Sequence, residues 1–284
     1  MIIKEIAKKF VFKLLTYSLK SASKEQGLSD LKLKLEKINP DLSGQYSSFK
    51  VEGGYLVNKV YLQHAFQVSL AQDAISLLDN KKRKSFTIVD IGDSSGSHLQ
   101  YLTNLEKGIT RAISVNLDPE AVKKIQKRGF EAIESRAELL HEHPNFNGRS
   151  DIFLSYEMVE HLLDPISFLH EMSIKSKCDF FVVTVPYQHS SRVGMHQIRN
   201  CISSASPFNA EVTHIFEFSP NDWDLIFKFS GWRVVKRVYY TQYPKNKLNP
   251  FSLLKYVWRK LDFDGFYGVI LEKDDSVSRH YQNW

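Results

Sequence analysis

The sequence predicts an α/β protein built on a mostly parallel β-sheet. From residue 86 onward, short runs of β-branched and aromatic residues recur, and most are continuously apolar, as strands covered on both faces are. Helical stretches of about ten residues separate these runs, and such alternation is typical of β-α-β units. A glycine-containing turn follows the first run directly. Together these observations indicate a doubly wound sheet that binds a ligand at the carboxyl ends of its strands.

Residues 1–55 precede this pattern and predict an N-terminal helical extension. The stretch 1–20 is amphipathic and basic, and it lacks the uninterrupted apolar run of a signal peptide. The polar segment SASKEQG, residues 21–27, is expected to end the first helix, and NPDLSG, residues 39–44, to end a second. The remaining residues, 56–284, are expected to form one domain.

Apolar runs define the strands of the parallel part of the sheet. They are FTIVDIG (86–92), RAISVNL (111–117), EAI (131–133), DIFLSYE (151–157) and DFFVVTVP (179–186). Apolar groups at helical spacing predict a helix over residues 59–79, and further helices are expected from Ser95, Pro119 and Pro165. Proline suits the first turn of a helix, where a missing N–H group costs nothing.

The last third of the chain has a different pattern. Residues 232–244 and 266–273 predict two strands that pair as a long antiparallel hairpin. Residues 249–261 lie between them and predict a basic amphipathic helix. We therefore expect a parallel sheet that is closed by an antiparallel pair at one edge.

The turn after the first strand reads Asp90-Ile-Gly92-Asp-Ser94-Ser-Gly96. Glycine lets a backbone turn tightly and approach a nucleotide closely, and the helix that follows presents unpaired N–H groups at its start. The pattern resembles the acid–x–Gly–x–Gly–x–Gly motif of the class I methyltransferases that depend on S-adenosylmethionine (SAM). Ser94 stands where that motif has its middle glycine.

The resemblance extends over about residues 55–273 and implies a Rossmann-like sheet of seven strands with an antiparallel last strand. It also implies SAM as the cofactor. Cofactor contacts are expected from the turn and from the end of the second strand, at Asp90, Gly92, Asp93, Ser94, Gly96 and Asn116.

Asn116 stands where the family has a carboxylate that accepts both ribose hydroxyls. An amide can accept one hydrogen bond and donate another, so the same role is expected of it. Asp118 is expected to cap the helix that opens at Pro119. Residues 135–139 resemble the loop that lies along the adenine in this family.

A second motif follows the fourth predicted strand. Glu157, Glu160 and His161 stand at positions i, i+3 and i+4, which share a face if a helical turn begins there. This spacing resembles the ubiquinone-biosynthesis O-methyltransferases and the small-RNA 3′-end 2′-O-methyltransferases. His214 lies in a segment, THIFEFS, that resembles the RNA enzymes. The resemblance implies a divalent cation, Mg²⁺ or Mn²⁺, with Glu157, Glu160, His161 and His214 as its ligands.

A cation of this kind lowers the pKa of an acceptor hydroxyl and orients it toward the methyl group. The candidate catalytic residues are His161 and Glu157, and His161 or His214 is a candidate general base where it does not bind metal. In the metal-free alternative, Glu157 lines the cofactor pocket, Glu160 is solvated and His161 packs locally.

Residues 186–210 predict a long loop after the fifth strand, and a loop of this length is expected to face the acceptor. It holds His189, Arg192, His196 and Arg199. The two arginines are candidates for contact with a phosphate or carboxylate, and surface solvation is the alternative for each.

The expected reaction is methylation of a hydroxyl on a glycan or a lipid-linked precursor. Alternative acceptors are an RNA 2′-hydroxyl, which the modest net charge of +6 disfavours, and a quinone precursor. A non-catalytic SAM-fold binding module is the third hypothesis.

The basic segments 1–20 and 250–261 predict peripheral contact with an anionic membrane. Two cysteines, Cys178 and Cys201, are too few for a disulfide framework, so a cytoplasmic location is expected, with that contact at the inner face of the membrane.

Overall fold

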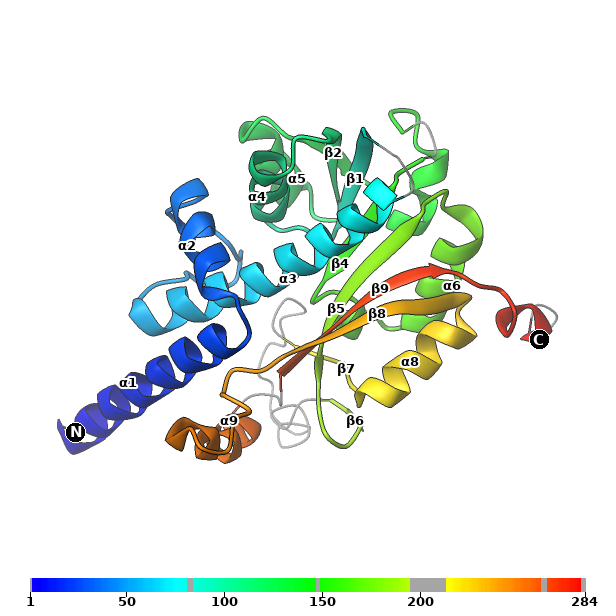
Figure 1. The fold of residues 1–284 in the computed structure, drawn as a ribbon. Helices are drawn as coiled ribbons and strands as arrows, with labels where there is room; N and C mark the ends of the chain where they lie inside the picture. The colour runs from blue at the N-terminus through cyan, green and yellow to red at the C-terminus, as the bar shows by residue number, and fades with distance from the viewer. Residues whose placement is uncertain (1, 81–83, 147–148, 195–212, 262–264, 282–284) are drawn as a thin grey trace, which may run out of the picture.

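One seven-stranded sheet lies at the centre of the molecule, with helices on both of its faces (Figure 1). The computed structural model describes residues 2–80, 84–146, 149–194, 213–261 and 265–281. The strands of the sheet are β1 (Phe86–Ile91), β2 (Ile109–Asn116), β3 (Glu131–Glu134), β4 (Ile152–Tyr156), β5 (Phe180–Tyr187), β8 (Trp232–Tyr240) and β9 (Gly265–Lys273).

The strand order is β3-β2-β1-β4-β5-β9-β8, and the first five strands of the chain run parallel. β9 is antiparallel to both of its neighbours, β5 and β8, with a register shift in β8 between Val234 and Lys236. The sequence prediction of a mostly parallel seven-stranded sheet with an antiparallel last strand is therefore confirmed. The predicted antiparallel pair, β8 and β9, does form. β8 is the edge strand of the sheet, and β9 lies between β8 and β5.

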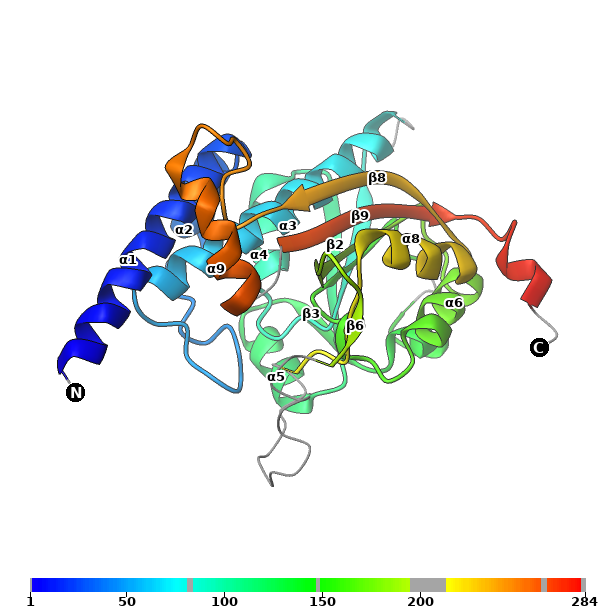
Figure 2. The same ribbon diagram turned by 90° about the horizontal axis from the view of Figure 1, so that it is seen from below.

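Two layers of helices cover the sheet (Figures 1 and 2). The helices are α1 (Ile2–Glu25), α2 (Ser29–Ile38), α3 (Gly54–Asn80), α4 (Ser97–Leu105), α5 (Pro119–Lys127), α6 (Pro165–Lys175), α8 (Pro220–Phe229) and α9 (Lys255–Leu261). One apolar core joins α1, α2, α3 and α4 to one face of the sheet. A second core joins α6 and α8 to the opposite face.

The N-terminal helical extension is present, but its first helix is longer than the sequence indicates. α1 continues through Ser21 and ends at Glu25, because Ala22 and Ser23 are buried and the Ser23 hydroxyl donates to the Lys20 carbonyl. The break comes at Gly27, whose φ of 70° lies in the left-handed region that glycine tolerates.

A short ribbon of two strands, β6 (Arg192–Val193) and β7 (Phe216–Glu217), lies outside the main sheet. It contains part of the long loop that the sequence places near the acceptor. His196 and Arg199, which the sequence also singles out there, lie outside the described residues. The backbone N–H of Ile215 donates to the carbonyl of Glu160, so the ribbon is attached to the segment after β4.

None of the helices in the described part of the chain is long and apolar enough to span a bilayer.

Candidate functional site: two halves of one pocket

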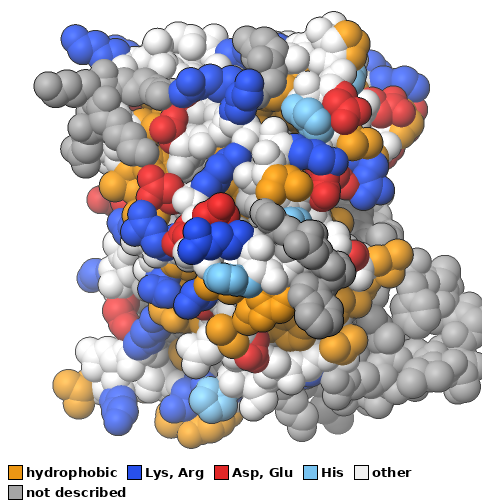
Figure 3. Space-filling model, turned by 90° about the vertical axis from the view of Figure 1, so that its right-hand side faces the viewer, with side chains coloured by type: hydrophobic (Ala, Val, Ile, Leu, Met, Phe, Trp, Pro, Cys, Tyr) orange, Lys and Arg blue, Asp and Glu red, His pale blue; other side chains and the backbone are white. Residues whose placement is uncertain are grey.

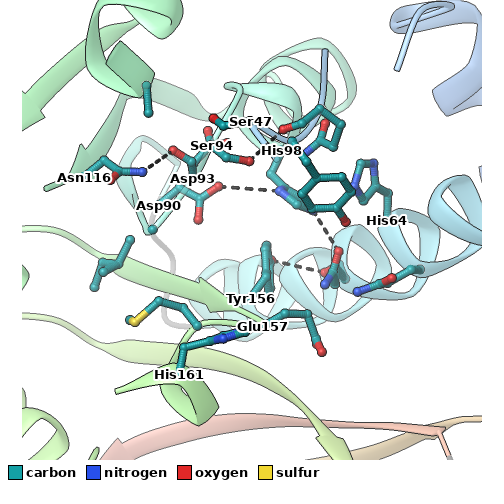
Figure 4. A pocket seen from close by; sticks show the side chains of 18 of the residues that line it. Ser47, His64, Asp90, Asp93, Ser94, His98, Asn116, Tyr156, Glu157 and His161 are labelled. Atoms are coloured by element: carbon teal, nitrogen blue, oxygen red, sulfur yellow. Dashed lines mark hydrogen bonds and ion pairs between the residues drawn. The ribbon is translucent and has the colours of Figure 1, made fainter. Parts of the chain in front are cut away.

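A pocket of about 850 Å³ opens at the carboxyl ends of β1, β2 and β4 (Figure 4). Residues 45–49, in the loop between α2 and α3, contribute to its wall, and Glu157 and Met158 contribute from the end of β4. A second pocket of about 520 Å³ adjoins it and shares Gly92, Asn116 and Met158 with it. The site lies where the sheet of a doubly wound fold is expected to bind its ligand.

Gly92 makes the sharp turn at the end of β1. Its φ is 83°, and a Cβ atom at this position would lie 2.8 Å from Cγ of Met158. Gly96, the N-cap residue of α4, also has a left-handed φ of 77°. Between them, the Asp93 carboxylate accepts hydrogen bonds from the N–H groups of Ser95 and Gly96, at 2.9 and 2.8 Å. The backbone therefore shapes this side of the pocket, as the glycine motif predicts.

Ser94 fits the turn without a left-handed backbone, because Glu157 is the only non-glycine residue with a positive φ in the described chain. Its hydroxyl donates to the carbonyl of Gln45, at 2.8 Å. The side-chain oxygen of Gln45 in turn accepts from the hydroxyls of Ser95 and Ser97, at 2.8 and 2.7 Å. The departure from the glycine motif thus belongs to a set of hydrogen bonds that fixes the N-terminal extension onto the turn.

Asp90 is buried beneath this turn, and its Oδ2 atom has no hydrogen-bond partner among the described residues. Burial, and to a lesser extent the charge of Asp93, raises the pKa of Asp90 well above its usual value. The nearest cation-forming group is His98, whose Nδ1 lies 3.7 Å from Oδ2 (Figure 4). Asp90 therefore offers a buried carboxylate oxygen to a cationic group in the pocket.

His98 is held in one orientation by its other ring nitrogen. Nε2 of His98 lies 2.9 Å from the side-chain oxygen of Gln67, which can only accept, so Nε2 carries the proton and Nδ1 faces Asp90 as an acceptor. Burial, and secondly the neighbouring His64, holds the pKa of His98 well below its usual value. Burial also lowers the pKa of His64 to about 3. Both rings are therefore neutral and leave the carboxylate uncompensated.

Asn116 lies at the pocket wall, as the sequence predicts, and its amide already makes two contacts. Its nitrogen donates to the carbonyl of Asp93 at 2.8 Å, and its oxygen accepts from the N–H of Asp118 at 2.9 Å. Each amide atom retains one further hydrogen-bonding position, and these two positions can bind the hydroxyls of a ribose. The predicted helix cap is confirmed, because the Asp118 side chain accepts from the N–H of Glu120.

The second half of the pocket contains Glu160, whose side chain is fully buried. Neither carboxylate oxygen has a hydrogen-bond partner among the described residues. Oε1 lies 3.7 Å from Nε2 of His161 and 3.9 Å from Nε2 of His214. One ligand atom from each of these three residues lies within 4.8 Å of the others. The structure thus gathers three of the four predicted metal ligands, and Glu160 is not solvated.

In each histidine of this cluster, Nδ1 faces a protein oxygen and Nε2 faces Glu160. Nδ1 of His161 donates to the carbonyl of Thr213 at 2.9 Å, and Nδ1 of His214 lies 3.4 Å from Oε1 of Glu217. Glu217 also accepts from Nε of Arg192 across the β6–β7 ribbon. A carbonyl or carboxylate behind each imidazole is the arrangement that orients metal-binding histidines.

Charges in this half favour a cation. Burial, and then the charges of Glu157 and Glu217, raises the pKa of Glu160 well above its usual value. For Glu217, burial raises the pKa, but hydrogen bonds from His214 and Arg192 lower it more. Arg192, a candidate for acceptor contact in the sequence, is thus paired inside the ribbon. Among the described residues, the ion-pair partners of Glu160 within 4.0 Å are His161 and His214, and neither is a lysine or an arginine.

Glu157 occupies a different position from the one that the motif implies. The turn after β4 is a short 3₁₀ helix, Val159–His161, and Glu157 precedes it with a left-handed φ of 52°. An α-helical face shared by Glu157, Glu160 and His161 therefore does not form. Glu157 lines the large pocket together with His161, and it lies outside the three-residue cluster.

Several site residues carry no signal in the sequence. Gln45 comes from a loop that is far from the turn in sequence, and His64 and Gln67 come from the middle of α3. His98 is the exception, because it follows the glycine turn directly on α4 and could have been noticed there.

The fold is a Rossmann-like sheet with a pocket at the ends of β1, β2 and β4. Residues 89–174 match the family model described as a methyltransferase domain. The matched segment runs from β1 into α6, and the sheet around it has the seven strands and the antiparallel last strand that the resemblance to class I SAM-dependent methyltransferases implies. No curated protein is similar enough in sequence to match it.

Solved structures of methyltransferases are similar to the chain. The putative methyltransferase of Haloferax volcanii, in complex with the Trm112 activator, has 18% identity and a TM-score of 0.48, over 68% of this chain and 84% of that one. A SAM-dependent methyltransferase from Archaeoglobus fulgidus has 18% identity and a TM-score of 0.45, over 72% and 94%. Magnesium protoporphyrin IX methyltransferase from Synechocystis PCC 6803, with bound SAM, has 7% identity and a TM-score of 0.48, over 78% and 86%.

Proposed function

We propose that the chain is an O-methyltransferase that transfers the methyl group of SAM to a hydroxyl of its acceptor with the help of a bound divalent cation. The observation that carries this proposal is Glu160, a fully buried carboxylate with no hydrogen-bond partner among the described residues, facing two imidazole Nε2 atoms. A buried charge of this kind is costly unless a cation compensates it.

The residues around Gly92 fit SAM. A side chain at Gly92 would collide with Met158 at the wall of the pocket, and Asp90 offers an oxygen to the ammonium group of the cofactor. The adjoining smaller pocket, lined by residues 135–138, suits the adenine, and Asn116 is our candidate for contact with the ribose.

Glu160, His161 and His214 would hold the cation on the acceptor side of the pocket. One carboxylate and two imidazoles suit Mn²⁺ better than Mg²⁺, which prefers oxygen ligands throughout. When bound, the cation lowers the pKa of a hydroxyl. Glu157 lines the same pocket and is our candidate to take the hydroxyl proton, while the S–CH₃ bond breaks and an O–CH₃ bond forms.

The acceptor that we propose is a hydroxyl-rich glycan or a lipid-linked precursor of one. Ser47, Ser48, Gln63 and Lys59 line the large pocket and offer hydrogen bonds to several hydroxyls. An RNA 2′-hydroxyl or a quinone precursor keeps the same reaction with another acceptor.

The cation site can be tested without an acceptor. Isothermal calorimetry and thermal unfolding of the metal-free protein are expected to show Mn²⁺ binding that Glu160→Gln and His214→Ala remove, while SAM affinity stays unchanged. Glu134→Gln, an exposed carboxylate on β3, is the matched control and should bind Mn²⁺ normally. Equal Mn²⁺ binding by all variants would refute the cation site.

Methyl transfer provides the second test. With labelled SAM and a panel of glycan, lipid-linked, RNA and quinone-type acceptors, a chelator should stop transfer to the accepted class and leave SAM binding intact. Full turnover by the chelated protein would show that the three residues are structural. A protein that binds SAM but methylates no acceptor class would support the non-catalytic hypothesis.

A further inference from the structure

Two segments from opposite ends of the chain form one end of the molecule. α1 and the segment from Asn249 to α9 lie side by side in both ribbon views (Figures 1 and 2). The amide of Asn249 donates to the Ser21 hydroxyl, and the indole N–H of Trp258 donates to Ser18, at 2.5 and 3.2 Å. The rings of Tyr17 and Phe251 stack, with centroids 6.1 Å apart. These contacts make the two segments one continuous surface.

Large apolar side chains project from this surface into solvent. The exposed fractions are 61% for Phe10, 46% for Tyr17, 68% for Leu253, 62% for Tyr256 and 91% for Leu248. We call this patch, together with the cations described next, the α1–α9 surface. Single exposed apolar residues are ordinary, but a patch gathered from two segments marks an interaction site.

The charges of the α1–α9 surface have one sign. Residues 10–24 contain three lysines and no acidic residue, and residues 245–261 contain five lysines and arginines and no acidic residue. Lys13, Lys20 and Lys24 are exposed, and the ammonium group of Lys255 lies 4.9 Å from the ring of Tyr256. At the junction of the segments, the Glu25 carboxylate accepts hydrogen bonds from the backbone N–H groups of Lys245 and Asn246.

The opposite end of the molecule has no such bias. Figure 3 faces that end and shows Lys and Arg side chains interspersed with Asp and Glu. On it, Lys175 pairs with Glu171, and Arg233 pairs with Glu272 across β8 and β9. The absence of acidic residues from positions 10–24 and 245–261 is therefore a local property.

We propose that the α1–α9 surface docks the protein on an anionic lipid bilayer. Aromatic and aliphatic side chains enter the boundary between headgroups and acyl chains, and the lysines contact anionic headgroups. A second copy of the chain fits less well, because a two-fold interface would bring two basic surfaces together.

A row of rings connects the α1–α9 surface with the pocket. Phe12 stacks on Tyr55 at 5.0 Å, Tyr55 stacks on Trp258 at 6.2 Å, and the ammonium group of Lys59 lies 5.9 Å from the Trp258 ring. Lys59 itself lines the large pocket. The row places the α1–α9 surface next to the pocket, so, if the proposed hydroxyl methylation holds, docking brings the pocket close to an acceptor anchored in the same bilayer.

The test is co-sedimentation with phosphatidylcholine vesicles, with and without phosphatidylglycerol, at low and high salt. The full-length protein should bind only the anionic vesicles, and salt should weaken the binding. The variant with Lys13→Glu, Lys20→Glu and Lys255→Glu should lose about fivefold in affinity or more for each lysine. Leu253→Ser with Tyr256→Ser should also weaken binding. Lys228→Glu with Leu225→Ser, on exposed positions of α8, is the matched control and should bind normally.

Melting temperature and SAM calorimetry show that each variant is folded, and vesicle binding needs no turnover, so this test is independent of the proposed reaction. Failure to bind anionic vesicles at low salt would overturn the proposal. So would equal binding by the charge variant and the control. If the vesicles are not bound and sedimentation velocity shows a dimer that Leu253→Ser with Tyr256→Ser disrupts, the surface belongs to a second copy.

Discussion

The two halves of the pocket each contain a buried carboxylate with an unpartnered oxygen, but the chain positions these carboxylates in different ways. Asp90 ends up in place through a single local turn, and the two glycines of that turn follow it within six residues. Glu160 depends on His214, more than fifty residues later in the chain, and on a two-stranded ribbon behind it. Residues close in sequence thus place the carboxylate of the cofactor half, and distant segments place that of the acceptor half.

The two carboxylates also face different neighbouring groups. The histidine beside Asp90 uses one nitrogen for Gln67 and is neutral, so a single cationic group from a ligand can compensate the charge. Glu160 faces two imidazoles whose Nε2 atoms lie 3.7 and 3.9 Å from its Oε1 atom, a set of atoms that suits an ion with several ligands. The two buried carboxylates therefore differ in their surroundings, and our proposal assigns an ammonium group to Asp90 and a metal ion to Glu160.

The largest effect is expected where the turn of the cofactor half is blocked. Gly92→Val should lower SAM affinity by about a hundredfold or more, because relieving the left-handed backbone and the collision with Met158, each on the order of 1–3 kcal/mol, moves the turn and Met158 out of the positions that shape the cofactor pocket. Calorimetry with SAM measures this. Gly129→Val is the matched control: its φ is 85°, but no atom lies within 4 Å of the added Cβ, so only stability should fall. Normal SAM affinity in folded Gly92→Val would place the cofactor elsewhere.

A smaller, pH-dependent effect is expected at Asp90. Burial raises the pKa of Asp90 in the folded protein. As pH rises above the usual value of 3.8, the Asp90 carboxyl therefore loses its proton in the unfolded chain at a lower pH than in the folded protein. The folded, SAM-free protein should therefore lose stability with rising pH, by at most about 1.4 kcal/mol per pH unit from this group, until Asp90 itself ionises. Asp90→Asn should remove this component and be more stable at high pH, while binding SAM at least about tenfold more weakly.

Urea unfolding of wild type and Asp90→Asn across the pH range gives the difference curve. A difference that does not change with pH would mean that Asp90 is already compensated in the SAM-free protein.

The smallest effect is expected at Asn116, where substitutions test the hydrogen bond between this side chain and the Asp93 carbonyl in the cofactor half. Asn116→Asp replaces the N–H that donates to the Asp93 carbonyl by an oxygen, so two oxygens would face each other. Stability of the SAM-free protein should fall by about 1–3 kcal/mol. Asn116→Ser, which lacks the opposing charge, should lose less. Thermal and urea unfolding check this order, and an unchanged Asn116→Asp protein would contradict the role of the contact.

The parts of this structure that sequence could predict are those fixed by short-range patterns. Apolar runs located the strands, and the turn from Asp90 to Gly96 located the end of the sheet that binds ligands. His214 was found through a short segment that resembles other enzymes. The metal role for it and for Glu160 stays a prediction.

Other features depend on distant contacts that leave no periodic trace. Ser94 departs from the glycine motif in sequence, and nothing nearby in sequence indicates that its hydroxyl donates to the carbonyl of Gln45. The helical face expected for Glu157 did not form, because the chain enters a 3₁₀ turn from a left-handed residue. Ser21 was expected to begin a break, but small buried side chains let α1 continue.

The position of β9 has a consequence for how the chain acquires its fold. β9 is the last strand in sequence, yet it lies between β5 and β8 and provides the hydrogen bonds to both. During synthesis, β8 therefore emerges with its neighbour in the sheet still missing, and strands add in order only as far as β5. Pairings across such long sequence separations are slow to form. Truncation before residue 265 would leave β8 without its partner strand, and the pocket would lack Phe266.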